Sequence, residues 1–493
     1  RFFTSVRKLK VLPSVQESCF MKKFCFFSLS HLVVRGVLGI SIITSVPALA
    51  DESIISAQQM IGEENLPDLY SVTPNGSVHN GQSLDMSDAV AMAVNWHPTI
   101  TQAVGKLFEQ SANVDVAKAK YYPQVNAGVN NGYSNTYTNK GYSPSIDISL
   151  SQMLYDFGKV SSSVRAANAA VAQQQAEVML TIDQVAHDTA SAVVQVQGYQ
   201  QLVTMATQQL DSLKKIGNLI RQRNTEGASP LSDVVQTDTR IEGAQATLMQ
   251  YQASLQRWQA TLATYIGVQG VNRVTQDVPE TLTRACAVQH PDYKLIPSVL
   301  AAWAGANQAQ ANVDNANAQM MPTISLEPEV THYLNDHYSG SSELDKTQYT
   351  ASIRMQMPLY QGGGLSASRD AAEQALSAAN AAIKAAQLEA YQKLATSQDE
   401  ATNLGQTLVI QQRQQALGEK TLGLYQDQYL QLGTRPLLDL LNVDQEIFQA
   451  KFSQAQTLAQ LNSLQLDCLF STGMMRSVFR LDNRRIQGVD IRP

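Results

Sequence analysis

The stretch GASPLSD at residues 227–233 returns as GTRPLLD at residues 433–439, an offset of 206 residues. Four other landmarks recur in the same order, with offsets of 193, 199, 205 and 206 residues. They are His97-Pro98 with His290-Pro291, YYPQV at 121–125 with MMPTI at 320–324, LYDFG at 154–158 with LYQGG at 359–363, and Gly267 with Gly473. Five ordered landmarks predict an internal duplication, with two halves of about 200 residues each.

Each half predicts the same order of elements: a helix, two strands, a long helix, a turn and another helix. Residues 99–120 and 297–319 are rich in Ala and Gln and predict the first helix of each half. Each of these helices stops before a proline, Pro123 or Pro322.

The helices that follow the strands are unusually long. No proline interrupts residues 158–223 or 365–432, so each stretch predicts a helix on the order of 100 Å long. The helices after Pro230 and Pro436 are shorter, because each ends near a landmark glycine. We therefore expect two short helices to stack end to end beside each long one.

Four segments alternate apolar and polar residues over about 9–11 residues, the length of a tilted strand that crosses a bilayer. A soluble, half-buried sheet would show the same alternation. Tyrosines near the strand ends favour a membrane sheet, because aromatic residues gather at membrane interfaces. The predicted strands lie at about residues 123–138, 143–155, 322–334 and 348–360, and the tyrosines are Tyr133, Tyr137, Tyr142, Tyr333, Tyr338 and Tyr349.

The predicted strands are too few to form a channel alone. Four strands cannot close a barrel with room inside, and an open sheet edge is not tolerated in lipid. After residue 50, no apolar run reaches the roughly 18 residues that a membrane helix needs. We therefore predict an α+β membrane protein whose transmembrane β-barrel is shared between chains. The strands require more than one chain and do not fix the number.

The first 50 residues predict a removable leader. From Met21, two lysines precede an interrupted apolar run, and Ala48-Leu49-Ala50 then precedes Asp51 as in a signal-peptide cleavage site. Residues 1–20 are expected to lie upstream of the true translation start at Met21. A membrane anchor is the alternative interpretation of the apolar run. Removing the leader's seven Lys/Arg and one Glu from 36 basic and 42 acidic residues leaves a formal charge of −12. That balance excludes a nucleic-acid partner.

The landmarks also divide the rest of the chain. We expect an N-terminal extension at residues 51–83, a first repeat at 84–282, a second repeat at 283–475 and a C-terminal tail at 476–493.

The sequence contains no recognisable catalytic motif. His97 and His290 each precede a proline at an expected helix start, so a structural role is favoured over metal binding. The glycines at residues 362–364 lack the lysine and the spacing of a phosphate-binding loop. We expect no enzymatic activity, no cofactor and no metal site.

The chain resembles the TolC family of outer-membrane efflux and secretion proteins over about residues 84–475. The most specific motifs are DAV at 88–90 with NWHP at 95–98, AKYYP at 119–123, LYDFG at 154–158 and GTRPLLD at 433–439. The resemblance implies a homotrimer in the outer membrane, with a twelve-strand barrel, a long antiparallel α-helical periplasmic tunnel and an equatorial collar. It also implies a periplasmic adaptor protein and an inner-membrane ABC or proton-driven transporter as partners.

The resemblance implies a periplasmic gate just after the second tip turn. Arg435 and Asp439 match the family's arginine latch and an acidic ring position, whereas Asn442 stands where a second acid is expected. That departure should weaken cation binding. Three Asp439 side chains around a narrow axis would attract cations on physical grounds. A solvated helix N-terminus is the alternative.

The two tip turns are implied adaptor-docking sites, although any tight turn between helices would look the same. Their residues are Gly227, Ser229, Pro230, Gly433, Thr434 and Pro436.

Of the four cysteines, only Cys286 and Cys468 follow the leader. Both are expected at the collar in an oxidising compartment, so we predict a disulfide between them. Two buried free thiols are the alternative. The cysteine pair resembles the agglutination-protein branch of the family, which is linked to type I protein secretion. Multidrug efflux is the alternative function within the family, and a non-conducting trimeric coiled-coil surface adhesin is the alternative from another class.

Overall fold

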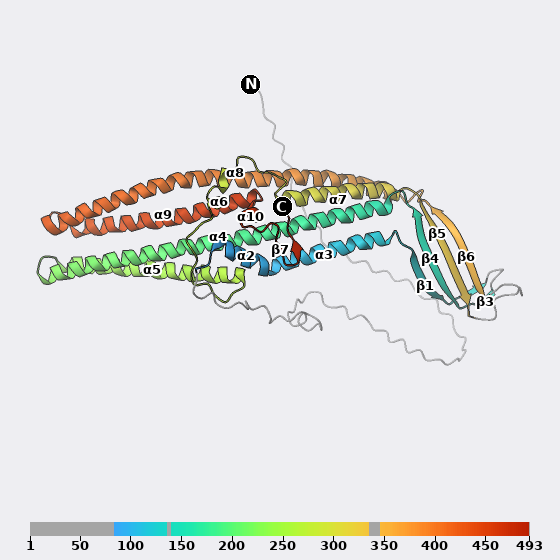
Figure 1. Cartoon of the computed structure of the whole chain (residues 1–493), viewed down its shortest axis with the longest axis horizontal. Helices are drawn as coiled ribbons and strands as arrows, with labels where there is room; N and C mark the ends of the chain where they lie inside the picture. Colours follow the sequence, from blue (N-terminus) through green and yellow to red (C-terminus); the bar gives the residue numbers. More distant parts are fainter. Residues whose placement is uncertain (1–82, 136–139, 335–345, 493) are drawn as a thin grey trace, which may run out of the picture. The chain divides into compact units, whose positions relative to one another are not determined.

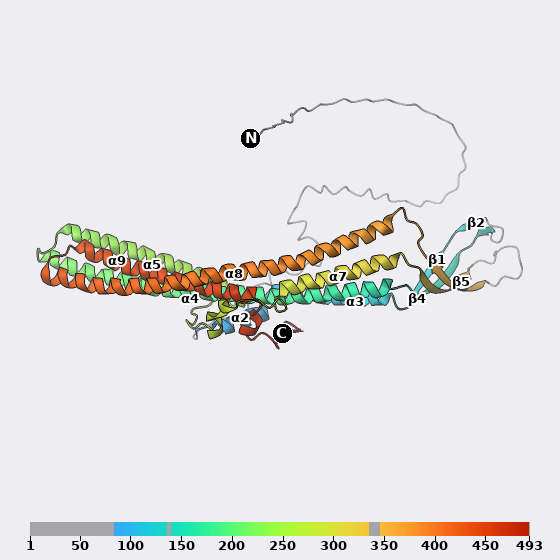
Figure 2. The same ribbon diagram turned by 90° about the horizontal axis from the view of Figure 1, so that it is seen from above.

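Each half of the chain contributes one long helix with shorter helices packed along it (Figures 1 and 2). The computed structural model describes residues 83–135, 140–334 and 346–492, all of which belong to one compact unit of the chain, Val72–Pro493. The predicted leader and nearly all of the predicted extension lie outside these residues.

In the first half, α4 (Lys159–Thr225) is the long helix, and its 67 residues span about 100 Å. Helix α5 (Leu231–Ile266) returns along one end of α4, and α3 (Pro98–Ala119) packs along the other end. The expected end-to-end arrangement of two short helices beside a long one is therefore present.

The second half repeats this arrangement. The long helix α8 (Gly364–Asp427) packs with α9 (Leu437–Ser471) at one end and with α7 (Pro297–Gln319) at the other. Because α7 and α9 also contact α4, they lie between the two long helices. The result is a layer of helices, with a tip turn at the end of each long helix (Figure 1).

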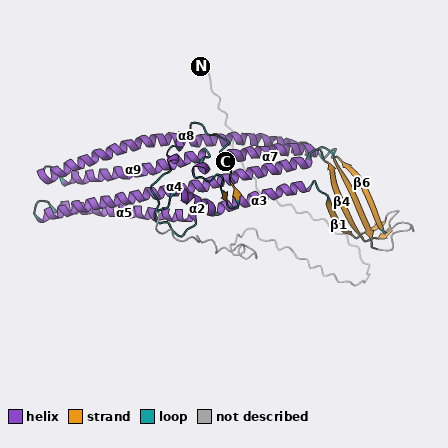
Figure 3. Ribbon diagram, viewed as in Figure 1, coloured by secondary structure: helices purple, strands orange, loops and turns teal. Residues whose placement is uncertain are grey.

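An antiparallel four-stranded sheet joins the halves at the far end from the tips (Figure 3). Its order is β1 (Gln124–Asn130), β4 (Ser145–Tyr155), β5 (Thr323–Tyr333) and β6 (Thr347–Gln356). The central β4–β5 pair crosses between the halves, for example where Ile148 faces Val330. Strands β1 and β6 form the two edges and have no further partner strand among the described residues.

Two predicted strands are shorter than expected. The strand predicted at 123–138 breaks after Asn130, at Asn131-Gly132, and β2 (Tyr133–Asn135) pairs instead with β3 (Lys140–Tyr142). The strand predicted at 348–360 ends at Gln356, because Pro358 cannot donate to the ladder and restricts the residue before it. Two of the interfacial tyrosines, Tyr137 and Tyr338, lie outside the described residues.

The repeated LYDFG and LYQGG motifs make the turn from strand to long helix. Phe157 and Gly158 have φ values of 54° and 98°, and Gly362 and Gly363 have 61° and 83°. Both turns therefore need two consecutive left-handed residues, which favours glycine. The Asp156 carboxylate stabilises the first turn by accepting from the Gly158 and Val160 amides at 3.0 and 2.6 Å.

The largest buried cluster lies midway along the layer, where α5 gives way to α3 and α9 gives way to α7. We call this region the waist. Helix α2 (Met86–Trp96) covers it, together with the short helices α6 (Glu280–Thr283) and α10 (Met475–Val478) and the hairpin β7–β8 (Arg485–Ile486 and Val489–Asp490). Its fully buried side chains include Met86, Ile182, Leu262, Leu282, Leu466, Leu469, Met475 and Leu481.

The predicted correspondence between His97-Pro98 and His290-Pro291 is wrong. His97 does precede a helix, since it caps α3 and Pro98 begins it. His290-Pro291 lies in a loop, and the second-half helix begins at Pro297 instead. Pro297 follows Pro98 by 199 residues, the offset of the neighbouring YYPQV and MMPTI landmark, so Pro98 and Pro297 are the equivalent positions.

None of the helices in the described part of the chain combines the length and the apolar character that a membrane span requires.

Candidate functional site

The first tip is a compact turn in which the Gln222 amide donates to the Glu226 carboxylate at 3.1 Å. Helix α4 ends at Thr225, and Gly227 takes a φ of 73° before Pro230 leads into α5. The Asn224 side chain donates to the Ser229 carbonyl at 2.7 Å and closes the turn. The hydroxyl-bearing side chain of Ser229 is buried.

The second tip has the same glycine and proline but adds an arginine with three partners. The Arg435 guanidinium forms an ion pair with Asp439 at 3.0 Å and donates to the Gln428 side chain at 2.9 Å. It also lies 4.3 Å from the centre of the Tyr425 ring, a cation–π contact. The structure therefore brings Arg435 and Asp439 together within one protomer.

The chain before the second tip is irregular. Helix α8 ends at Asp427 and continues as a π-helix over Gln428–Leu432, and Gly433 then takes a φ of 62°. The first tip has no such segment, because α4 remains α-helical to its end. A π-helix is rare and concentrates at functional sites.

Asn442 makes a different contact from the one the family pattern implies. It accepts from the Arg240 guanidinium at 3.3 Å, and Arg240 also donates to Gln445. These bonds join α5 of the first half to α9 of the second half. Asn442 therefore lies in a contact between the two short tip helices.

Sequence reasoning missed a tyrosine that packs the two tips together. Tyr429 is 6% exposed, with the Arg223 guanidinium 4.9 Å from its ring centre and its hydroxyl 3.5 Å from that of Ser229. Tyr425 and Tyr429 are four residues apart on one helix face, a spacing that could have revealed the pair before the tip.

At the waist, the C-terminal segment supplies a buried ion pair that the sequence did not reveal. Arg476 binds Asp183 of α4, and their side chains are 6% and 1% exposed. Burial raises the pKa of Asp183 to about 7, although the Arg476 guanidinium lowers it. Arg476 also donates to the Leu295 carbonyl at 3.3 Å, so it holds α4, the loop before α7 and α10 together.

A second charged group at the waist is His187. Its Nε2 lies 2.8 Å from Asp467 of α9, and its Nδ1 lies 3.2 Å from Asp188. Burial opposes the charged imidazole, but the bonds and charges of the two carboxylates prevail and raise its pKa to about 9.

Cys286 and Cys468 are joined in the structure, with 2.05 Å between the sulfur atoms and 5.2 Å between the Cα atoms. The bond links the turn after α6 to α9 near its last turn. The Gln465 side chain accepts from the Cys286 amide at 3.0 Å beside it.

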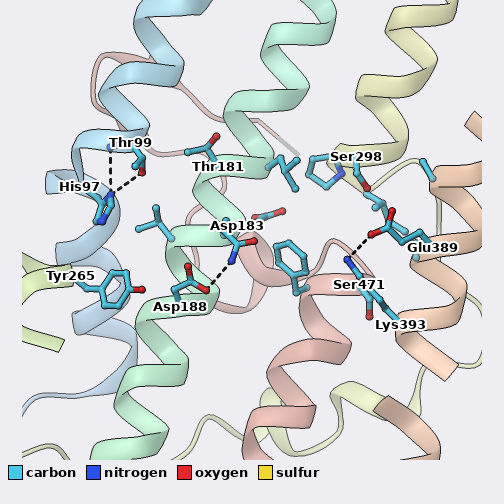
Figure 4. Close-up of a pocket in the computed structure, with 18 residues that line it drawn as sticks. His97, Thr99, Thr181, Asp183, Asp188, Tyr265, Ser298, Glu389, Lys393 and Ser471 are labelled. Carbon is cyan, nitrogen blue, oxygen red and sulfur yellow. Dashed lines mark hydrogen bonds and ion pairs between the residues drawn. The ribbon is translucent and has the colours of Figure 1, made fainter. Parts of the chain in front are cut away.

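A cavity of about 800 Å³ lies at the waist, at the junctions between the stacked short helices (Figure 4). In Figure 4, His97 and Thr99 border one side of α4, and Glu389 and Lys393 of α8 border the other. Glu389 and Lys393 form an ion pair at 2.7 Å, and Asp188 binds His187, so the charges around this cavity are internally paired. The described residues contain no group of three or more His, Cys, Asp and Glu that could hold a metal ion.

Most α4 residues that border the cavity share one side of the helix, although Asp183 borders the cavity and also binds Arg476 of α10. Thr181, Gln184 and Asp188 follow one face at helical spacing and border the cavity. Ile182 and Ala186 point the other way, into the core under α2 and α10. The cavity therefore adjoins the core of the waist, with Asp183 in contact with both.

Long paired helices that lead into an antiparallel four-stranded sheet, with the unit duplicated, define a class of outer-membrane channel proteins. The model of the outer membrane efflux protein family matches residues 90–268 and 295–467. The chain belongs to this family, which confirms the resemblance to TolC and makes it an outer-membrane transport protein rather than an enzyme.

Curated relatives and solved structures agree with this assignment. The outer membrane efflux protein BepC of Brucella suis is 22% identical over 420 residues, which cover 82% of this chain and 89% of BepC. Protein CyaE of Bordetella pertussis is 24% identical over 57% of this chain and 61% of CyaE. The outer membrane protein VceC of Vibrio cholerae has the same fold, with a TM-score of 0.67 and 18% identity over 79% of this chain and 96% of VceC.

Proposed function

We propose that the chain is one protomer of a homotrimeric outer-membrane channel that exports substrates received from a periplasm-spanning pump. The observation that carries this proposal is the four-stranded sheet, whose edge strands β1 and β6 pair with no further strand in the part of the chain that the structure describes. Large apolar side chains stand exposed along those edges, including Val129 at 74% and Ile353 at 70%. Such edges in lipid require pairing, and three copies would supply the twelve strands of an open barrel.

The helical layer would form the wall of the tunnel below that barrel. With α2 and the C-terminal hairpin on the outer face, the cavity beside Asp188 and Glu389 would face the lumen. Exposed apolar residues on α8, such as Ile410 and Leu417, would then pack against the next protomer.

The second tip is the proposed periplasmic gate. The Arg435–Asp439 pair and the Tyr425 contact hold the chain beside a π-helix, which supplies a local irregularity where the helix end can move. Three Asp439 carboxylates at the tunnel entrance would attract cations, while Asn442 would contribute no charge. The turns at Gly227 and Gly433 are the proposed docking sites for a periplasmic adaptor.

Type I protein secretion is our proposed pathway, with an ABC transporter as the inner-membrane partner. It rests on the likeness of the Cys286 and Cys468 pair to the agglutination-protein branch. Multidrug efflux is the second candidate, because the relative BepC is described as an efflux protein. Deletion of the gene separates them: loss of a large secreted protein supports secretion, and drug sensitivity with unchanged secretion supports efflux.

Reconstitution tests the channel itself. The purified protein should migrate as a heat-sensitive trimer and conduct ions in planar bilayers. Divalent cations added on the periplasmic side should block the current, and Asp439→Ala should weaken that block. Asp233→Ala, at the equivalent position after the first tip, is the matched control and should leave the block unchanged. A protein that forms no pores would overturn the channel, and equal block in all three proteins would place the cation site elsewhere.

A further inference from the structure

The C-terminal hairpin presents a group of arginines that the channel function does not use. Arg480, Arg484, Arg485 and Arg492 are all exposed, and none forms an ion pair with any described residue. They fall within 13 residues of a chain whose formal charge, once the predicted leader is removed, is strongly negative. We call these four residues the arginine patch.

The arginine patch stands on a fixed support. Beneath it, Phe479, Leu481, Ile486 and Ile491 are each less than 5% exposed. The Gln487 side chain donates to the carbonyls of Val94 and His97 at 3.0 and 3.1 Å, which fastens the hairpin to the junction of α2 and α3. The Ile491 amide donates to the Arg484 carbonyl at 3.0 Å, so Arg484 and Arg492 are held in neighbouring positions. The backbone that carries the four arginines is therefore held in place before any ligand binds.

The arginine patch lies far from the sheet that would meet the membrane. Gln487 binds at the beginning of α3, and the sheet follows the other end of that helix. The 22 residues of α3 place about 33 Å between them. Charges in solution are screened within about 8 Å at physiological ionic strength, so lipid headgroups beside the sheet are out of reach. The partner must lie in the periplasm at the level of the waist.

The surroundings of the patch fit a charged polymer better than a folded protein. No large hydrophobic side chain between residues 476 and 492 is exposed, and the neighbours Ser477, Asn483 and Gly488 are small or polar. Asp490, which lies opposite Arg485 in the hairpin, is the one exposed acidic residue in this stretch. Protein interfaces usually need an apolar centre that is buried on contact. Arginine forks bind carboxylates in bidentate fashion, which suits a ligand with many separate carboxylates.

We propose that the arginine patch binds the carboxylate-rich glycopeptide polymer of the cell wall and holds the waist of the channel within it. The proposal uses the periplasmic placement of the helices but does not depend on conductance, on the gate or on the nature of the cargo. A channel that conducts normally without binding the wall would refute this inference alone.

Pelleting with isolated cell-wall sacculi tests the proposal. The sacculi are treated with protease to remove attached proteins and are mixed with the purified full-length trimer. The triple variant Arg480→Gln, Arg484→Gln, Arg492→Gln should bind at least about tenfold more weakly than the wild type. Converting the sacculus carboxylates to neutral amides should weaken wild-type binding to the same degree, as should high salt.

A charge-matched variant provides the control. Lys106→Gln, Arg257→Gln, Arg273→Gln also removes three exposed basic residues, and it should bind sacculi like the wild type. Equal binding by the patch variant, equal loss in both variants, or binding only to sacculi with attached proteins would overturn the proposal. Both variants must remain heat-sensitive trimers, which shows that folding is intact.

Discussion

The tips and the waist are built from the same duplicated helices but are held by different forces. At the waist, Arg476 and Asp183 form a buried ion pair, and a disulfide joins α9 to the turn after α6. At the second tip, Arg435 and Asp439 form an ion pair whose side chains are more than one third exposed, beside a π-helix. A buried pair is costly to break, whereas an exposed one contributes little stability. The difference indicates a fixed waist and tips that can move.

The largest expected effect is at the waist. Arg476→Ala leaves the Asp183 carboxylate buried without its partner and should lower the free energy of unfolding by about 3–5 kcal/mol. Thermal unfolding of the purified protein measures it. Arg480→Ala removes an exposed arginine four residues away and should change stability by less than about 0.5 kcal/mol. Similar midpoints for the two variants would show that the buried Arg476–Asp183 pair does not hold the waist together.

The disulfide should have the next largest effect. Replacing Cys286 and Cys468 with Ser should lower stability by about 2–4 kcal/mol, because the bond constrains a loop of 182 residues in the unfolded chain. Alkylation of the native protein, followed by mass spectrometry with and without reductant, reports the state of the pair. Two thiols that react without reductant would show that the bond does not form.

His187 should make the stability of the waist depend on pH. Its folded pKa is about 9, above the value of about 6.5 for a free histidine, so the charged form is favoured by folding. This contribution is fully present below about pH 6.5 and is lost as pH rises through about 9, on the order of 3 kcal/mol in all. His187→Gln should abolish that part of the pH dependence. An unchanged slope between pH 6.5 and 9 would assign it to other groups.

Much of the helical layer could be predicted from the sequence, because proline and glycine positions mark helix ends locally. The predicted helices at 99–120 and 297–319 agree with α3 and α7 to within a residue or two. The strand limits were less accurate. The first prediction ran past Asn131-Gly132, where the apolar alternation of Val125, Ala127 and Val129 already stops, and the last ran past Pro358, where a proline ends the pairing.

The waist could not be predicted in the same way. Arg476 and Asp183 are 293 residues apart, and no periodic pattern links them. Residues 476–493 were predicted to be a tail, yet Phe479, Leu481 and Ile486 are buried in the core of the waist. For the proposed gate, the motif indicated Arg435 and Asp439 but not the π-helix at Gln428–Leu432. The packing of Tyr429 depends on its contact with Arg223 of the other tip, which no local pattern marks.

A small expected change in stability accompanies the largest expected change in function at the second tip, and this variant tests the movable tip most directly. Arg435→Ser gives the second tip the residue that the first tip has at the equivalent position, Ser229. It removes the contacts with Asp439, Gln428 and Tyr425, and should lower stability by no more than about 1 kcal/mol. Single-channel conductance in planar bilayers should rise severalfold over the wild type, with the thermal midpoint nearly unchanged. Equal conductance in the two proteins, or a rise matched by loss of the folded trimer, would contradict a tip that opens on a fixed waist.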